Sequence, residues 1–263
     1  MLVRDGKYKV ADYFVKQLKI INMSPELKTA LVTGGNKGIG FAICKGLLDA
    51  EFNVFLAARS TDKGKAAVEK LSTNDNSIQL VELDVTDDES IKSAVNSVNQ
   101  ITDSLDVLVN NAAIYPDLRG AEQGVNILTV SRDLLTKTIN TNAFSPISIT
   151  QAFLPLLEKA DNPKVINVSS GNGQLDGLSA NVPSYSLSKL ALNGATILLA
   201  DALKSKNIAV YAMCPGWVKT DMGGYSAPRT PEQGADTAIW LATEATMQES
   251  GKFFRNRTEQ PYQ

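Results

Sequence analysis

The sequence predicts a single, doubly wound α/β domain built on a parallel sheet of seven strands. Its 263 residues match the length of one large α/β domain. From Lys28 onward, short runs rich in β-branched residues alternate with longer amphipathic stretches, as expected when helices cross over between parallel strands. No repeat, low-complexity tract or linker interrupts this alternation. We therefore expect one domain over residues 27–263.

The strands follow in order from runs that are short, apolar and bounded by turn residues. Helices fill the intervals between them. One helix begins with the acidic run from Asp87 to Glu89, whose charge suits the positive end of a helix dipole. The longest begins at Pro183 or Ser184 and continues through Leu203. The seven strands are expected at 29–33, 53–58, 78–83, 107–109, 165–168, 209–213 and 252–254.

Composition excludes several classes of function. Lys and Arg number 26 against 28 Asp and Glu, so the chain lacks the basic excess of a nucleic-acid binder. It contains no histidine, which excludes Ser-His-Asp hydrolysis, Cys-His proteolysis and imidazole zinc sites. Cys44 and Cys214 lie too far apart for a thiolate metal site or a disulfide framework. With neither a membrane span nor a signal peptide in the sequence, we expect a cytoplasmic protein without a metal.

Residues 1–26 lie outside the periodic pattern. Lys7, Lys9, Lys16 and Lys19 alternate there with aromatic and apolar residues. A short amphipathic helix for a partner or a membrane surface is one interpretation. A dispensable upstream extension, with translation starting at Met23, is the favoured one.

The first predicted strand, Thr29–Thr33, leads directly into a glycine turn and an apolar helix. Glycines adopt backbone angles closed to other residues, and the free N–H groups at a helix start attract a pyrophosphate. The turn therefore predicts a bound nucleotide, although glycines serving only a tight turn are the alternative. The absence of a G-x-x-x-x-G-K-[ST] motif disfavours an NTPase. The candidate cofactor residues here are Gly34, Asn36, Lys37, Gly38, Ile39 and Gly40.

The end of the second strand predicts which nicotinamide cofactor is preferred. An acidic side chain at this point would accept from the ribose 2′-hydroxyl, whereas a basic one favours a 2′-phosphate. The chain has Arg59 there, and Lys37 supplies a second cation. We therefore expect NADPH or NADP⁺ as cofactor, with a solvated surface charge as the alternative for Arg59.

Tyr185 and Lys189 form the candidate chemical pair. Their i, i+4 spacing on a predicted helix puts phenol and ammonium on one face. A nearby cation stabilises a phenolate and lowers the pKa of the tyrosine. Taken alone, such a pair usually marks a boundary between core and solvent, so the surrounding motifs decide its interpretation.

Six motifs occur together in order. They are Thr33-Gly34 through Gly38-x-Gly40, Asp84-Val85, Asn110-Asn111-Ala112, Ser169-Ser170, Tyr185-x-x-x-Lys189 and Pro215-Gly216. With them the chain resembles the classical short-chain dehydrogenase/reductase family over residues 27 to 256. The strings TGGNKGIG, CPGWVKTDM and SGKFF are similar, more narrowly, to its carbonyl reductase branch. The resemblance implies a Rossmann fold that reduces aldehydes or ketones with NADPH.

The resemblance also implies residue roles. Tyr185 would protonate the carbonyl oxygen, Lys189 would hold the nicotinamide ribose, and Ser170 would bind the substrate oxygen, with Ser169 left to bond at the strand end. Asn142 would kink a helix and hold a water, with Asn140 as its competitor. The cofactor would further contact Asp84, Val85, Asn111, Pro215, Gly216, Val218 and Thr220.

Substrate and assembly are less defined. Tyr115, Trp217, Met222 and Tyr225 are candidates to line an apolar substrate cleft. Only fifteen residues lead from Ser170 to Tyr185, without the long insertion of animal carbonyl reductases. Helices near 142–159 and 184–204 are thereby free to pair, which favours a homodimer or homotetramer. The alternatives for function are a reductase of a dedicated ketone or acyl-carrier substrate, and a silent NADP(H)-sensing protein.

Overall fold

The computed structural model describes residues 23, 27–72, 77–117 and 125–263. Apart from Met23, the N-terminal extension expected at residues 1–26 lies outside the described residues. Residues 73–76 and 118–124 also lie outside them.

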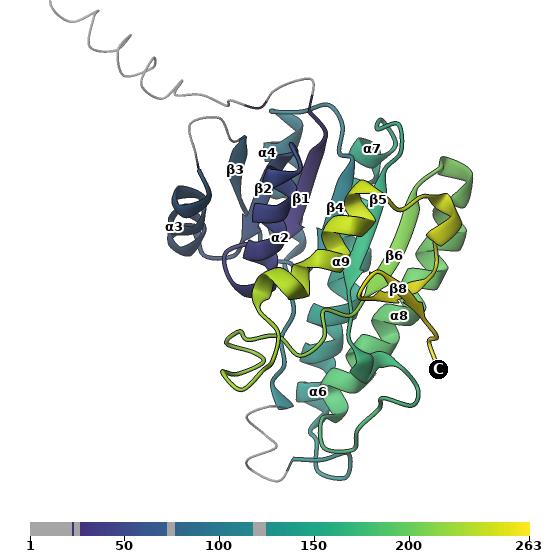
Figure 1. The fold of residues 1–263 in the computed structure, drawn as a ribbon. Coiled ribbons are helices and arrows are strands. Elements are labelled where there is room, and N and C mark those ends of the chain that lie inside the picture. The colour runs from purple at the N-terminus through teal and green to yellow at the C-terminus, as the bar shows by residue number, and fades with distance from the viewer. Residues whose placement is uncertain (1–22, 24–26, 73–76, 118–124) are drawn as a thin grey trace, which may run out of the picture.

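One sheet runs through the molecule in the order β3-β2-β1-β4-β5-β6-β7-β8 (Figure 1). The neighbours from β3 to β7 pair in parallel, as predicted, and the β7–β8 pair is antiparallel. The strands are β1 (Thr29–Thr33), β2 (Asn53–Ala58), β3 (Ile78–Glu82), β4 (Val107–Asn110), β5 (Lys164–Val168), β6 (Ala209–Met213), β7 (Phe253–Arg255) and β8 (Thr258–Gln260).

Helices cover both faces of this sheet. Apolar residues of α2, α3 and α9 pack on one face, and those of α4, α7 and α8 pack on the other. Within β1, Ala30 and Val32 face the first layer while Leu31 faces the second, so the strand reads as a continuous apolar run. The helices are α2 (Gly38–Asp49), α3 (Thr61–Leu71), α4 (Asp88–Asn99), α6 (Arg132–Ile139), α7 (Ser145–Leu157), α8 (Pro183–Leu203) and α9 (Pro231–Thr243).

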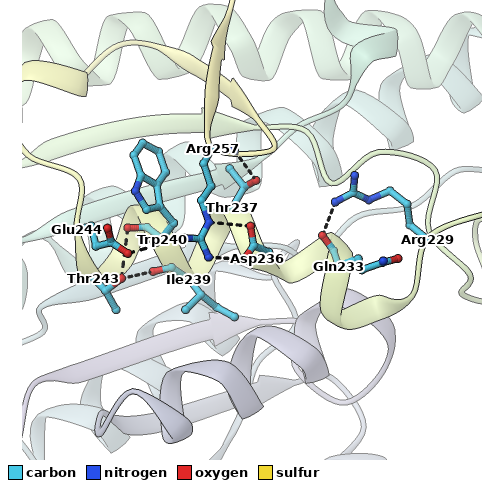
Figure 2. Close-up of polar contacts among 9 residues, drawn as sticks. All are labelled: Arg229, Gln233, Asp236, Thr237, Ile239, Trp240, Thr243, Glu244 and Arg257. Atoms are coloured by element: carbon cyan, nitrogen blue, oxygen red, sulfur yellow. Dashed lines mark hydrogen bonds and ion pairs between the residues drawn. The ribbon is translucent and has the colours of Figure 1, made fainter.

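The eighth strand corrects the predicted count of seven. After β7 the chain turns through Asn256 and Arg257, both with positive φ, and returns as β8. Arg257 also donates to Asp236 and Thr237 of α9 (Figure 2). The hairpin is thereby fixed to the helix. Its returning strand is short and largely exposed, so no apolar pattern marked it in the sequence.

The strand order determines where a doubly wound sheet has its ligand-binding crevice. After β1 the chain builds outward through β2 and β3, then crosses back to β4 on the other side of β1. Ligands of doubly wound sheets bind beside such a reversal, at the carboxyl ends of the strands. Among the described residues, no helix is both long and apolar enough to cross a bilayer.

Candidate active site

A cleft of about 1140 Å³ opens at the carboxyl ends of the strands. Its walls come from the glycine turn, the ends of β2 to β6, and the start of α8. It brings together every predicted catalytic and cofactor residue except Asn142. Those that line it are Gly34, Asn36, Lys37, Gly38, Ile39, Gly40, Arg59, Asp84, Val85, Asn111, Ser170, Tyr185, Lys189, Pro215, Gly216, Val218 and Thr220.

The glycine turn needs its glycines for two different reasons. Gly38 has φ +56°, in the left-handed region that L side chains rarely adopt. Gly40 allows a close approach, because a Cβ there would lie 2.3 Å from the Gly34 carbonyl oxygen. Asn111 fixes the turn from the end of β4, since its Nδ2 donates to the carbonyl of Thr33 at 2.8 Å. The N-terminus of α2 thus faces the cleft on a rigid support.

At the end of β2, the side chain of Arg59 is 80% exposed, and its Nη1 lies 3.8 Å from an oxygen of Asp84. Burial opposes ionisation of Asp84, but hydrogen bonds from Thr86 and the charge of Arg59 hold the pKa of this carboxyl below its usual value. Asp84 therefore carries a negative charge beside Arg59.

Lys37 is paired across the cleft. Its Nζ lies 2.7 Å from Asp221, and both side chains are largely exposed. The hydrogen bond from Lys37 holds the pKa of Asp221 below its usual value. Lys37 therefore forms an ion pair with Asp221, a residue that was not among the predicted site residues. Arg59 forms its longer ion pair with Asp84, which was.

Tyr185 and Lys189 lie on one face of α8, as predicted. Lys189 Nζ is 5.7 Å from the centre of the Tyr185 ring and donates to the carbonyl of Val168 at 2.7 Å. The side chain of Ser170 hydrogen-bonds Tyr185. Ser169 instead donates to Asn193 in the core, the strand-end role that had been expected of it.

The acidity of this pair differs from the expectation. Burial raises the pKa of Tyr185, and the hydrogen bond from Ser170 opposes that rise without reversing it. Burial also lowers the pKa of Lys189 to about 8. The net pKa of the phenol is therefore raised, against the expected net lowering, because desolvation penalises both charged forms.

Asn142 lies outside the cleft, fully buried. It belongs to a π-helical turn, Asn140–Phe144, between α6 and α7, which is the predicted interruption of a helix. Its amide accepts from the N–H of Ile114 and donates to the Ile114 carbonyl and to Ser188. Asn140, its competitor, lines the cleft.

Sequence reasoning missed Asp117. This carboxylate is fully buried, and its Oδ2 accepts from Ser184 Oγ and from the backbone N–H of Tyr185, both at 2.7 Å. A lone acid in a loop carries no motif, so no signal in the sequence marked it.

Three of the four candidate substrate side chains line the cleft, and one does not. Tyr115, Trp217 and Met222 line the cleft, and the ring of Tyr115 stacks on Tyr185 with centroids 4.0 Å apart. Tyr225 is 94% exposed and does not line the cleft, so its expected place there is wrong.

Comparisons with known proteins agree with this geometry. The family model for short chain dehydrogenase matches residues 28–230. The NADPH carbonyl reductase 1 of pig (Sus scrofa) is 32% identical, over 84% of this chain and 88% of its own. (+)-Neomenthol dehydrogenase of Arabidopsis thaliana is also 32% identical, over 81% and 90%. The NADPH-bound structure of carbonyl reductase from chicken fatty liver aligns with a TM-score of 0.78 at 30% identity, over 87% and 96%.

Proposed function

The chain belongs to the short-chain dehydrogenase family, and on this premise we propose that it is an NADPH-dependent reductase of aldehydes or ketones. Tyr185 is the proton donor in this reaction. The observation that carries the proposal is the placement of Tyr185, Lys189 and Ser170 in one cleft with the glycine turn.

The residues of the cleft fit NADPH. A pyrophosphate needs free N–H groups and close backbone approach, which the N-terminus of α2 offers beside Gly38. A 2′-phosphate needs an accessible cation, and Arg59 supplies one. Bound NADPH would supply the hydride that the carbonyl carbon receives.

The protein residues handle the substrate oxygen and its proton. Ser170 donates a hydrogen bond to that oxygen and Tyr185 transfers its phenolic proton to it, so that an alcohol leaves. The phenol of Tyr185 is protonated at neutral pH, as an ordinary tyrosine is, and this is the form that a proton donor requires. Lys189, 5.7 Å from the ring centre, stabilises the phenolate that remains.

The experiment is the oxidation of NADPH, followed by its absorbance, with a panel of aldehydes, quinones and ketones. Tyr185→Phe should lower turnover by about 10² to 10⁴, the usual contribution of a positioned acid, while NADPH binding stays unchanged. Tyr225→Phe is the matched control, because the same hydroxyl is removed from a residue that is 94% exposed.

A Tyr185→Phe variant with the wild-type rate contradicts the assignment of Tyr185. NADPH binding without any Tyr185-dependent turnover instead supports the alternative of a silent cofactor sensor. Turnover confined to one ketone or to an acyl-carrier substrate supports the dedicated reductase.

Pairing of two chains belongs to the same proposal. Phe144 at the start of α7, and Ile197 and Leu198 on α8, are large apolar side chains that remain about half exposed or more. Such residues favour a helical interface between copies. Light scattering measures the mass, and a monomer at micromolar concentration contradicts the pairing.

A further inference from the structure

The start of α8 lacks a cap of its own. Val182 at the N-cap makes no side-chain hydrogen bond, and the first turn contains no acidic residue. A helix start leaves backbone N–H groups that need acceptors and favours negative charge. The Tyr185 N–H is one of these groups, and Asp117 from a distant loop accepts from it.

Burying this carboxylate is costly. Asp117 is fully buried, and in the part of the chain that the structure describes its Oδ1 has no hydrogen-bond partner. A buried acceptor without a partner costs free energy. Its Oδ2 contacts at the start of α8, with Ser184 Oγ and the Tyr185 N–H, offset part of this cost.

A second chain of contacts reaches the other side of the same residue. Ser188 Oγ donates to the carbonyl of Tyr185 at 2.7 Å, and Asn142 donates to Ser188 at 3.0 Å. Asn142 also holds both backbone groups of Ile114. The loop from Ile114 to Asp117 is therefore connected to α8 at both of its ends.

Between these two ends the loop contacts the ring. Tyr115 stacks on Tyr185, with centroids 4.0 Å apart and planes inclined by 17°. One four-residue loop thus holds the backbone N–H of Tyr185 through Asp117 and one face of its ring through Tyr115.

We infer that Asp117 is a positioning residue for Tyr185 and acts together with Tyr115 as a clamp on its backbone and ring. This inference rests on the proposed role of Tyr185 as proton donor. A small displacement of a reacting group can cost about a hundredfold in rate, so the clamp acts on kcat rather than on cofactor affinity.

The test compares kcat, the KM for NADPH and thermal stability across variants. Asp117→Ala should lower kcat by about thirtyfold or more and leave the affinity for NADPH within about twofold. Asp117→Asn should recover most of kcat, because a carboxamide oxygen still accepts from the Tyr185 N–H and Ser184. Rescue by Asn separates the hydrogen bond from the charge.

Asp87→Ala is the matched control. Asp87 also caps a helix, accepting from the Ser90 N–H at the start of α4, but it does not touch Tyr185. The variant should lose stability while its kcat stays at the wild-type value. An equal loss of kcat in Asp87→Ala and Asp117→Ala overturns the inference, since the effect is then one of stability alone.

The ring contact is tested by Tyr115→Ala. This variant should lower kcat, because it removes the ring that stacks on Tyr185. Combined with Asp117→Ala, Tyr115→Ala should add less than its separate effect, since residues acting through one group are not additive. If the two losses of kcat are additive, Asp117 and Tyr115 do not act together. If Asp117→Ala does not fold, an unchanged kcat in Tyr115→Ala overturns the clamp.

Failure here is distinct from failure of the proposed function. If Tyr185→Phe is inactive and Asp117→Ala retains full kcat, only the positioning role is wrong. If Tyr185→Phe is fully active, the proposed proton donor is wrong and the clamp has no reaction to serve.

Discussion

The side chain of Arg59 is accessible and lies 3.8 Å from a carboxylate oxygen of Asp84. An exposed pair at this distance is worth little, so Arg59 is free to bind a phosphate. We expect Arg59→Asp to weaken NADPH binding by about tenfold or more and to change NADH binding much less. Titration of each cofactor by fluorescence measures both constants.

Lys70→Asp is the control for Arg59→Asp. It introduces the same change of charge on exposed α3, outside the cleft, and should leave both constants unchanged. Equal weakening of NADPH and NADH by Arg59→Asp would mean that Arg59 does not contact the 2′-phosphate.

Single residues were predictable where a motif fixes their neighbours along the chain. Tyr185 and Lys189 share a helix face because of their spacing, and Gly38 lies in a turn that needs it. Asp117 and Asp221 were not predictable, because each acts on a partner brought near only by folding: Asp117 lies 68 positions from Tyr185, and Asp221 lies 184 from Lys37.

At the scale of elements, the β7–β8 turn combines strain with an ion pair. Asn256 and Arg257 both have positive φ, as a two-residue type I′ hairpin turn requires. Arginine is disfavoured there, but its guanidinium makes two contacts with Asp236. The ion pair offsets the backbone strain.

This balance predicts the order of two variants at Arg257. Arg257→Ala loses the ion pair and keeps the strain, so the free energy of unfolding should fall by about 1 kcal/mol. Arg257→Gly loses the same ion pair but relieves the strain, so it should unfold close to the wild type. Urea titration measures both, and equal destabilisation by Ala and Gly would exclude a role for the turn conformation.

The same hairpin shows where prediction of elements stops. Five strands, β1, β2, β4, β5 and β6, were predictable because both of their faces are buried, which favours runs rich in apolar residues. In β8 two of three residues are exposed, and its turn lacks the Asn-Gly pair that marks a type I′ hairpin. Because β8 is largely exposed, its sequence does not need the apolar run by which a buried strand is predicted.

For the whole molecule, two buried lysines link stability to pH. Lys164 donates to the carbonyl of Ala242 near the end of α9, and burial, helped by the charge of Lys28, lowers its pKa to about 8. Burial also lowers the pKa of Lys189, which lines the cleft, to about 8. Unfolded lysines titrate near 10.4.

The sign of the effect follows from proton counts. Below pH 8 both states hold these protons, so the two lysines contribute no slope. Between about pH 8 and 10 the unfolded chain holds protons that the folded protein has released, and the free energy of unfolding therefore rises with pH. Burial raises the pKa of Cys44, whose thiol in the unfolded chain titrates at about 8.5, so Cys44 opposes part of the rise within this range. Burial also raises the pKa of Tyr185 and Tyr211, but these phenols oppose the rise only near pH 10, where unfolded tyrosines begin to ionise.

We expect each buried lysine to raise the free energy of unfolding by about 1 to 2 kcal/mol between pH 8 and 9.5, and Cys44 to offset part of their sum. Lys164→Gln should remove about half of the lysine contribution, because Lys189 remains. Lys70→Gln, an exposed lysine on α3, should keep the wild-type slope. Urea unfolding at several pH values measures the slopes, and equal slopes in the wild type and Lys164→Gln would mean that Lys164 keeps its proton in the folded protein.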